Sequence, residues 1–321
     1  MLELPKSVLP LLIAAGWVPG RRATVEQGIP SDHPAVAILA EFGGLHVRTK
    51  SDNRSDVVFE YHDITKDPLF TLWQELLKTR LIYVGQSADG YEYFLVDHSG
   101  RWFQASVMNC AIEFVGYAFA EAVERILLIG MQDLNCHRPR SGRPTPVPPT
   151  ANDLSARVSP TLAVPLSVHP LFTAAGWKPE RRVLVYRGVP PDHPAAAILA
   201  SLGNLHIGTT GAGLDRARSD IEFVWDDIED DQQLGHWQGL LGTEFVSIGH
   251  YQRRYCQLLV DGKGRCFSSN IVSAGFDFEG HTFAEAIERI LLGQLPFDRS
   301  SRAARLDMGS AARRNRPAGP I

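Results

Sequence analysis

The sequence has few cysteines, and none of them falls in a pattern that a disulfide or a zinc site requires. Its 321 residues include only four, Cys110, Cys136, Cys256 and Cys266, without a CxxC pair. None occupies an equivalent position in the internal repeat described below. A shared disulfide or zinc framework would have been copied with the repeat. We therefore expect no cofactor and no metal, and a reducing compartment, the cytoplasm.

Long apolar runs and a basic surplus are missing as well. No run approaches the ~18 apolar residues of a membrane span. The apolar stretch in residues 1–16 recurs in mid-chain at 166–177, which assigns it to the fold rather than to a signal peptide. The net charge is −4 overall, and residues 10–130 and 170–298 carry roughly −5 and −6. A nucleic-acid-binding domain needs a basic face, so we expect no membrane contact and no nucleic acid bound by the folded domains.

Motifs of known catalytic sites are absent too. The chain has no GxSxG elbow, no HExxH, no Walker loop and no dinucleotide fingerprint. The prediction is a protein that is not an enzyme. One enzymatic alternative stays open, in which the repeated Asp-His pairs described below act as acid and base.

What the sequence does contain is a duplication. Residues 28–46, GIPSDHPAVAILAEFGGLH, return at 188–206 as GVPPDHPAAAILASLGNLH. With a shift of 160 positions, roughly 22 of the 36 residues from 11 to 46 are identical to their counterparts. After an insertion near 209–217 the shift is 164, and FAEAVERILL at 119–128 matches FAEAIERILL at 283–292. A whole domain has been duplicated.

The duplication sets the expected domain limits. The first domain covers 1–132 and the second 166–298. Between them, residues 133–165 are rich in proline and are predicted to be an extended linker. Residues 299–321 are rich in arginine and are predicted to be a disordered tail.

Each copy alternates helical and strand patterns. In the first copy, apolar spacing predicts helices at 7–15, 34–42, 68–78 and 119–128. Strands are predicted at 21–26, 45–49, 56–61, 81–86, 91–97 and 101–106, the last three as a meander. The predicted class is α+β, a mainly antiparallel sheet with helices packed on one side, duplicated as two similar domains.

The closing helix shows how the copies differ. In the second copy it begins with Thr-Phe-Ala-Glu, a capping box in which Thr282 and Glu285 bond unpaired N–H groups. The first copy has Ala118 in place of that threonine, so we expect a weaker helix start there.

The repeated Asp-His-Pro triplet is explained by the start of a helix. Proline suits the first turn because its missing N–H would be unpaired there anyway, and an aspartate before it complements the helix dipole. The histidine is expected to be a cap, and a metal site built on it lacks the spacing of zinc ligands. The recurring residues assigned structural roles, including the glycine that ends the helix and a core tryptophan, are Trp17, Trp177, Asp32, Asp192, Pro34, Pro194, Gly43 and Gly203.

Candidate partner-binding residues lie where the copies differ. WDDIEDD at 225–231 replaces YHDITKD and is densely acidic. It is either a solvated loop with charges at a helix start or a contact surface for a basic partner. Two tryptophans without a counterpart are further candidates for the surface. The set is Trp225, Asp226, Asp227, Glu229, Asp230, Asp231 and Trp102.

These motifs resemble a known family. GWVPGRR and GWKPERR near the start of each copy, the HPAVAILAEFGGL helix with its glycine stop, and FAEAVERILL are similar to the SUKH-3 branch of the SMI1/KNR4 superfamily. The resemblance covers both copies. It implies an α+β fold without fixed catalytic residues, and many bacterial members are immunity proteins that bind and neutralise a toxin, frequently a nuclease or deaminase.

Three functions follow as hypotheses. The first is a non-enzymatic immunity protein that occludes a protein toxin with a basic surface. The second is a general protein-interaction scaffold of the SMI1/KNR4 type. The third is an enzyme that uses the Asp-His pairs.

Overall fold

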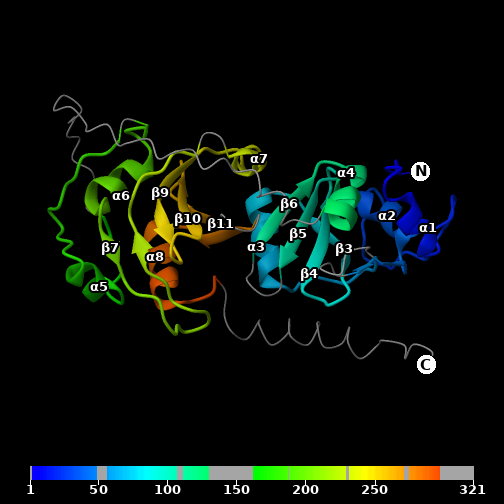
Figure 1. The fold of residues 1–321 in the computed structure, drawn as a ribbon, viewed down its shortest axis with the longest axis horizontal. Coiled ribbons are helices and arrows are strands. Elements are labelled where there is room, and N and C mark those ends of the chain that lie inside the picture. Colours follow the sequence, from blue (N-terminus) through cyan, green and yellow to red (C-terminus); the bar gives the residue numbers. More distant parts are fainter. Residues whose placement is uncertain are drawn as a thin grey trace. The chain divides into compact units, whose positions relative to one another are not determined.

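The computed structural model describes residues 2–48, 56–106, 111–129, 162–186, 188–228, 231–270 and 275–296. These residues form two compact units, 2–129 and 162–296, with the same order of elements (Figure 1). Each unit contains helices and an antiparallel sheet, which confirms the predicted α+β class and the duplication. The predicted linker and tail, apart from residues 162–165, lie outside the described residues.

The elements of the first unit begin with two helices and end with one. They are α1 (Leu9–Ala14), α2 (Pro34–Phe42), β1 (His46–Val47), β2 (Val57–Val58), α3 (Pro68–Leu77), β3 (Leu81–Ser87), β4 (Glu92–Asp97), β5 (Trp102–Ser106), β6 (Ile112–Gly116), α4 (Phe119–Glu124) and the π-helical turn η1 (Arg125–Ile129).

The second unit repeats this order without the π-helical turn. Its elements are α5 (His169–Ala174), α6 (Pro194–Leu202), β7 (His206–Ile207), β8 (Ile221–Glu222), α7 (Gln232–Leu241), β9 (Phe245–Tyr251), β10 (Cys256–Asp261), β11 (Cys266–Asn270), β12 (Phe276–Gly280) and α8 (Phe283–Leu292). None of the helices in the described residues is long and apolar enough to cross a membrane.

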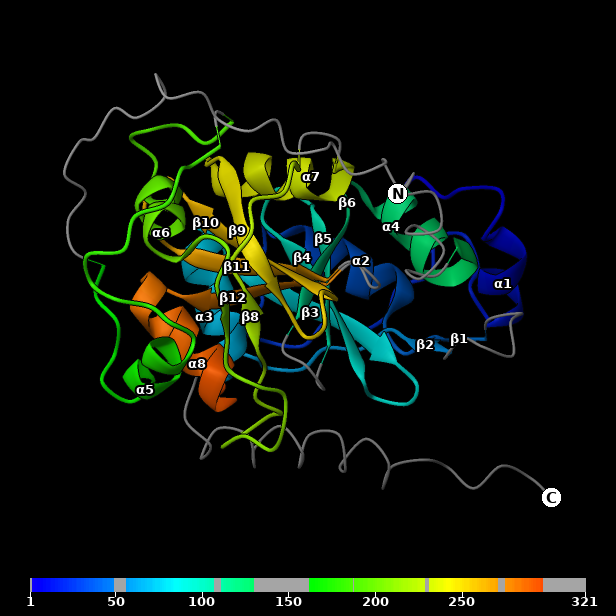
Figure 2. The same ribbon diagram turned by 60° about the vertical axis from the view of Figure 1, so that its left-hand side comes forward.

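The strands of each unit follow chain order across the sheet. β1 to β6 pair successively and antiparallel in the first unit, as do β7 to β12 in the second. Figure 2 shows the short strands β1 and β2 beside β3. Tight hairpins join the long strands, as expected for the predicted meander. A fourth long strand, β6 or β12, completes each meander.

The hairpin between β4 and β5 is held by a buried aspartate. The Asp97 side chain is fully buried, and its Oδ1 accepts hydrogen bonds from the main-chain N–H groups of Ser99 and Arg101, both at 2.9 Å. Its Oδ2 lies 2.5 Å from Nε of Arg101. Asp261 and Arg265 repeat this arrangement at 2.7 Å in the second unit. The buried charge of Asp97 is tolerated because three N–H groups donate hydrogen bonds to its carboxylate.

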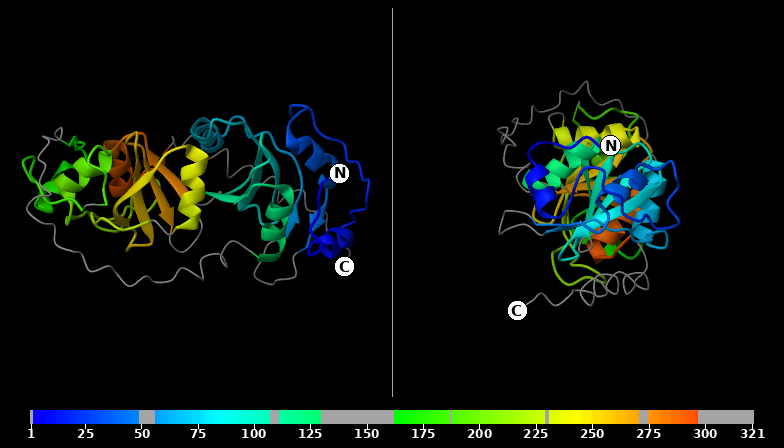
Figure 3. Two further views of the ribbon diagram at one scale, coloured as in Figure 1. Left: turned by 90° about the horizontal axis from the view of Figure 1, so that it is seen from above. Right: turned by 90° about the vertical axis from the view of Figure 1, so that its right-hand side faces the viewer.

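Helices cover both faces of each sheet. Phe94 packs in the core beneath α2 and α4, whereas its neighbour Tyr93 contacts Phe70 of α3, with ring centroids 6.1 Å apart. Neighbouring strand residues point to opposite faces, so α3 lies on the face opposite α2. In the second unit Trp237 of α7 likewise stacks on Phe276 of β12, with ring centroids 4.6 Å apart. Figure 3 shows α7, in yellow, on the side of this sheet opposite the green helix α6.

This corrects the prediction that the helices pack on one side. Among the described helices of the first unit, α1, α2 and α4 pack on one face and α3 packs on the other. The signal was present in the strands, since LIYV at 81–84 and YFLV at 93–96 are continuous apolar runs. Such runs are typical of a sheet buried on both faces, while alternation marks a sheet with one wet face.

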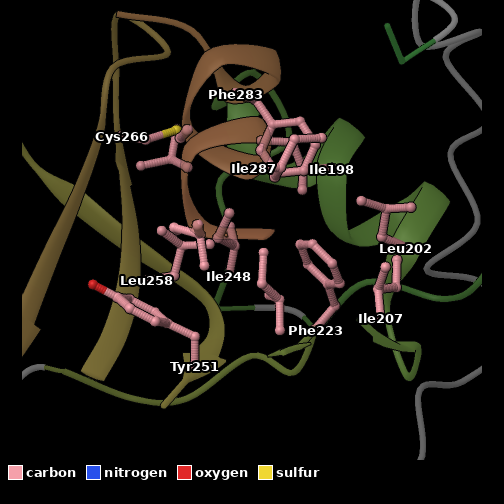
Figure 4. Packing of buried hydrophobic residues seen from close by; sticks show 14 of the residues in the cluster. Ile198, Leu202, Ile207, Phe223, Ile248, Tyr251, Leu258, Cys266, Phe283 and Ile287 are labelled. Carbon is pink, nitrogen blue, oxygen red and sulfur yellow. The ribbon is translucent and has the colours of Figure 1, made fainter. Parts of the chain in front are cut away.

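The core of each unit lies between the sheet and the three helices on the first face. In the second unit, Ile198 and Leu202 of α6 and Ile287 of α8 meet Phe223 and Ile248 (Figure 4). Trp17 and Trp177 are each 6% exposed at the margin of these cores. The Trp177 indole N–H donates to Oγ of Ser201 at 3.1 Å.

One predicted strand is wrong. Residues 21–26 are extended but pair with no strand. Instead, Ala23 donates its N–H to the carbonyl of Ala40 at 2.6 Å, and the Arg21 guanidinium donates to the carbonyls of Glu41 and Gly43 at 2.9 and 2.7 Å. The last carbonyls of α2 need donors from outside the helix, and this segment supplies them. The same bonds recur from Arg181 in the second unit.

The two glycines that end α2 are needed for different physical reasons. Gly44 has φ +80°, and its counterpart Asn204 has φ +64°, so this position takes the left-handed conformation. Gly43 has φ −50°, but a Cβ there would lie 2.4 Å from the Leu39 carbonyl oxygen. Gly203 would meet Leu199 in the same way, at 2.7 Å. The first glycine is therefore needed for close approach and the second position for its conformation.

The insertion of the second unit wraps the end of α8. Leu214 donates its N–H to Leu292, and Asp215 and Arg216 donate theirs to Gly293, at 2.8–3.0 Å. A Cβ on Gly293, which has φ +66°, would lie 2.2 Å from the carbonyl oxygen of Arg216. The residues of the insertion thus satisfy carbonyls that the helix leaves unpaired at its C-terminus.

Candidate partner-binding site

The acidic loop before α7 is exposed at its start, and its last residue is part of a helix cap. Asp226 and Asp227 are exposed, and Oδ2 of Asp226 lies 3.3 Å from Nε2 of His250. Asp231 is the N-cap of α7, where its Oδ1 accepts the N–H groups of Gln233 and Leu234 at 3.1 and 3.2 Å. Glu229 and Asp230 lie outside the described residues. The structure thus gives Asp231 a structural role and leaves Asp226 and Asp227 on the surface.

The two unmatched tryptophans have different surroundings. Trp225 is half-buried and stacks on Tyr186, with ring centroids 5.2 Å apart and an interplanar angle of 24°. Trp102 is 1% exposed, with its ring 5.5 Å from that of Phe119. The expectation that Trp102 lies at the surface is therefore wrong. Its counterpart Cys266 is also buried, so this difference between the copies is one of core packing.

The thiols of Cys256 and Cys266 are buried in the hydrophobic core of the second unit. Burial raises the pKa of the Cys256 thiol to about 12, and it raises that of Cys266 still further. A reactive cysteine needs the thiolate, which such environments disfavour. Among the residues that the structure describes, no cluster of three or more His, Cys, Asp or Glu side chains could hold a metal ion.

The histidine of the Asp-His-Pro triplet is the N-cap of α2. Nδ1 of His33 accepts the N–H of Ala35 at 3.2 Å, and only 2% of the residue is exposed. Burial is the largest effect on the pKa of His33 and lowers it. The main chain of Arg80 opposes burial, and weaker charge effects follow, with His98 and Arg80 lowering the pKa and Asp97 raising it. An imidazole serves as this cap only when Nδ1 is unprotonated.

His193 repeats the cap at the start of α6, with 3.2 Å between Nδ1 and the N–H of Ala195. Its pKa is lowered by burial too. Pro34 and Pro194 occupy the first helical position. The carboxylate of Asp32 is 73% exposed and lies 4.0 Å from Nε2 of His98.

The His33 cap predicts a pH dependence. Because the folded state lowers the pKa of His33, the unfolded chain binds more protons between the folded value and the ordinary value of about 6.5. The stability contributed above pH 6.5 should therefore be lost as the pH falls through that window. In His33→Asn the amide caps the helix without titrating, so hydrogen exchange of the first unit should become less dependent on pH between 7.5 and 5.

Two further variants control this prediction. His33→Ala, which removes the cap, should cost about 0.5–2 kcal/mol at pH 7.5. His46→Asn changes a histidine that is exposed and outside the cap, so the pH dependence should stay as in the unmodified chain. An unchanged pH dependence in His33→Asn would show that the cap is not its source.

An open cleft of about 720 Å³ lies in the first unit, beside the end of α2. Most of its lining comes from two segments outside the helices and strands, 23–28 and 60–65, and Arg80 also lines it. The lining residues are Ala23, Thr24, Val25, Glu26, Gln27, Gly28, Leu39, Gly43, Gly44, Glu60, Tyr61, His62, Asp63, Thr65 and Arg80.

Acidic side chains dominate the charge of this cleft. Oε1 of Glu60 lies 3.1 Å from Nε2 of His62, and this hydrogen bond raises the pKa of the imidazole despite its partial burial. Asp63 accepts hydrogen bonds from the hydroxyl and the N–H of Thr65, at 2.6 and 2.9 Å, which lower the pKa of that carboxyl. With Glu26, the cleft contains three carboxylates against one guanidinium.

The second unit has different chemistry at the equivalent positions. Tyr186 stands where the first unit has Glu26, Trp225 replaces Tyr61, and Glu244 replaces Arg80. The Trp225 ring lies so close to Gly188 that a Cβ on this glycine would be 2.9 Å from it. The stacked pair therefore occupies the region that remains open in the first unit.

Sequence reasoning missed this cleft. It searched for charge where the copies differ and found the run at 226–231, because five of its six residues are acidic. The cleft positions Glu26, Tyr61 and Arg80 are far apart in the chain, and none of them belongs to a run of like charges. The signal in the sequence was the whole set of differences between the copies, which includes these three positions.

Comparison with known proteins agrees with the repeat. A family model described as SUKH-3 immunity protein matches residues 4–128 and, a second time, residues 164–293. No curated protein and no solved structure matches the chain.

Proposed function

Because the chain belongs to the SUKH-3 immunity protein family, we propose that it binds a protein toxin and neutralises it by covering the toxin's active surface. The observation that carries this proposal is the match of the family model to each of the two units. Family membership implies a toxin-neutralising role. The identity of the toxin, a nuclease or a deaminase, and the binding surface are parts of the proposal.

The charge of the chain supports a basic partner. Both units are acidic, and Asp226 and Asp227 are exposed carboxylates beside a half-buried aromatic ring. Opposite charges at an interface raise the association rate and suppress wrong partners. A nuclease toxin would present such a basic surface at its active site. Binding then needs no catalytic group in this chain, which acts as a non-enzymatic protein in the cytoplasm.

The duplication supports a second element of the proposal. Two units joined by a proline-rich linker at 133–165 raise the effective concentration of the second unit once the first is bound. The domain limits we propose are therefore 1–132 and 166–298, with 299–321 as a tail outside both.

Co-expression with the toxin encoded nearest the gene tests the function. The expected result is rescue of growth by the full chain. If the chain rescued growth against none of the toxins encoded nearby, the immunity role would be contradicted and an interaction scaffold would be favoured.

Variants of the acidic loop test the surface. Asp226→Asn, Asp227→Asn, Glu229→Gln and Asp230→Asn together should slow association with the toxin by about tenfold at low salt, because charge steers the encounter. Asp231 is kept, since its change would remove the α7 cap. A chain with Asp32→Asn and Asp192→Asn is the matched control and should associate at the original rate. Equal rates in both variants would remove the acidic loop from the interface.

A further inference from the structure

We propose that the cleft of the first unit binds an extended segment of the partner polypeptide and receives an arginine or lysine side chain between Glu26 and Asp63. This inference rests on the proposed function and deepens it, because it names where and by what chemistry the toxin is held. It also makes the two units unequal, with the first providing this site.

The size and shape of the cleft fit a peptide segment. Its volume of about 720 Å³ falls within the range of roughly 300–1,000 Å³ that holds ligands with several functional groups. Most of its lining residues lie outside helices, with Leu39 of α2 as an exception, and Tyr61 contributes an aromatic ring.

Main-chain groups along the walls are available for pairing. Thr24, Val25 and residues 60–63 make no main-chain-to-main-chain hydrogen bond with the described part of the chain. Unpaired N–H and C=O groups in an extended segment are a template for an added strand, and many peptide-binding proteins use them in this way. A partner strand laid along either wall would gain hydrogen bonds that do not depend on its sequence.

The charges select a basic side chain. Glu26 is exposed and forms no hydrogen bond or ion pair within the described residues. Across the cleft, Asp63 is held by Thr65 in its charged form, and Glu60 is paired with His62. Arg80 is anchored by the carbonyl of Gly28 at 3.2 Å. A guanidinium or ammonium group at Glu26 would neutralise this carboxylate and lie near the charge of Asp63, while an acidic side chain would be repelled.

The second unit is the internal comparison. Tyr186 and Trp225 replace Glu26 and Tyr61 and stack on each other, so the counterpart of the free carboxylate is an aromatic ring already in contact. Glu244 replaces Arg80. The second unit therefore has no carboxylate equivalent to Glu26 with which a basic segment could pair.

Peptide titration of the full chain tests the inference without any toxin. The probe is a blocked heptapeptide of alternating threonine and arginine, with a glutamate version as control, followed by NMR chemical shifts at low salt. We expect shifts at residues 23–28 and 60–65 with the arginine peptide and at least tenfold weaker binding of the glutamate peptide. Glu26→Gln with Asp63→Asn should weaken arginine-peptide binding at least tenfold. Asp227→Asn, the counterpart change in the second unit, should leave it unchanged.

A second variant closes the cleft with residues that the chain already uses. Glu26→Tyr with Tyr61→Trp copies the stack of the second unit into the first and should abolish peptide binding. Circular dichroism and hydrogen exchange of the first unit check that each variant is folded. Equal binding by the closed variant, or no binding by the unmodified chain, would overturn the inference.

Toxin rescue separates this inference from the proposed function. If Glu26→Gln with Asp63→Asn still rescues growth at the original toxin dose, the cleft is not where the toxin binds, and the immunity role stands. If the unmodified chain rescues against no toxin yet binds the peptide through Glu26, the immunity role fails and the peptide site stands.

Discussion

Replacing Arg216 with methionine is expected to lower the free energy of unfolding of the second unit by about 3–5 kcal/mol. Nη2 of Arg216 lies 2.8 Å from Oε2 of Glu279, whose side chain is 2% exposed. Tyr251 and Ser268 donate their hydroxyls to Oε1 of the same carboxylate at 2.7 and 3.0 Å. The substitution would leave a buried carboxylate without its counter-charge, which is far more costly than losing an exposed pair.

In Arg216→Met, the contribution of Glu279 to the pH dependence of stability should also change sign. Burial alone raises the pKa of Glu279, but Arg216 and the hydroxyl donors outweigh it, so the pKa is lowered. A lowered carboxyl pKa gives stability that is present above the ordinary value of about 4.3 and is lost as the pH falls. Without Arg216 the remaining burial raises the pKa, and stability then falls as the pH rises. The deficit of Arg216→Met should therefore be larger at pH 8 than at pH 5.

Hydrogen exchange of peptides from the second unit measures this effect, since it reports each unit separately. Arg254→Met is the matched control, because Arg254 and Glu222 form a pair that is 44% and 37% exposed. Exposed pairs typically contribute about 1 kcal/mol or less. A similar small cost for Arg216→Met would contradict a tightly held buried network.

The second large effect is expected at the end of α2. Gly43→Ala places a Cβ 2.4 Å from the carbonyl oxygen of Leu39, a backbone atom that cannot rotate away. Relief requires the helix end to shift, at a cost of about 1–3 kcal/mol or more. Gly203→Ala should act in the same direction in the second unit. Urea unfolding combined with hydrogen exchange assigns the loss to the correct unit.

The neighbouring position provides the control for this prediction. Gly44→Asn introduces the residue that the second unit carries at position 204, where it has φ +64°. Nothing within 3.4 Å obstructs a Cβ on Gly44, the nearest atom being Nη2 of Arg21 at 3.8 Å. The cost should stay below about 1 kcal/mol, because asparagine tolerates the left-handed region. If Gly43→Ala proved as mild as Gly44→Asn, the close approach at Gly43 would not be a constraint.

The local rules of the sequence predicted the helix ends well. Thr282 accepts the N–H of Glu285 at 3.2 Å at the start of α8, while Ala118 provides no side-chain cap for α4. The predicted difference in capping is thereby confirmed, and the weaker start of α4 stays a prediction. Such features depend on residues three or four apart, so the sequence contains all the information they need.

The identity of the chain was also accessible from sequence. The repeated motifs all lie within the two ranges that the family model matches, residues 4–128 and 164–293. These residues define cores and helix ends, and they specify fold and family. They do not specify the partner, because the proposed contact residues lie where the two copies differ.

By itself, the sequence determined the duplication, the α+β class, the helix boundaries and the acidic character of both units, since each is a matter of spacing, composition or local capping. Only the tertiary structure decided that α3 and α7 cover the second face of each sheet and that Trp102 is buried. It alone brought Glu26, Asp63 and Arg80 together around one cleft, where the second unit stacks Tyr186 on Trp225. The physical reason is that burial and side-chain proximity depend on residues far apart in the chain, and no local pattern records them.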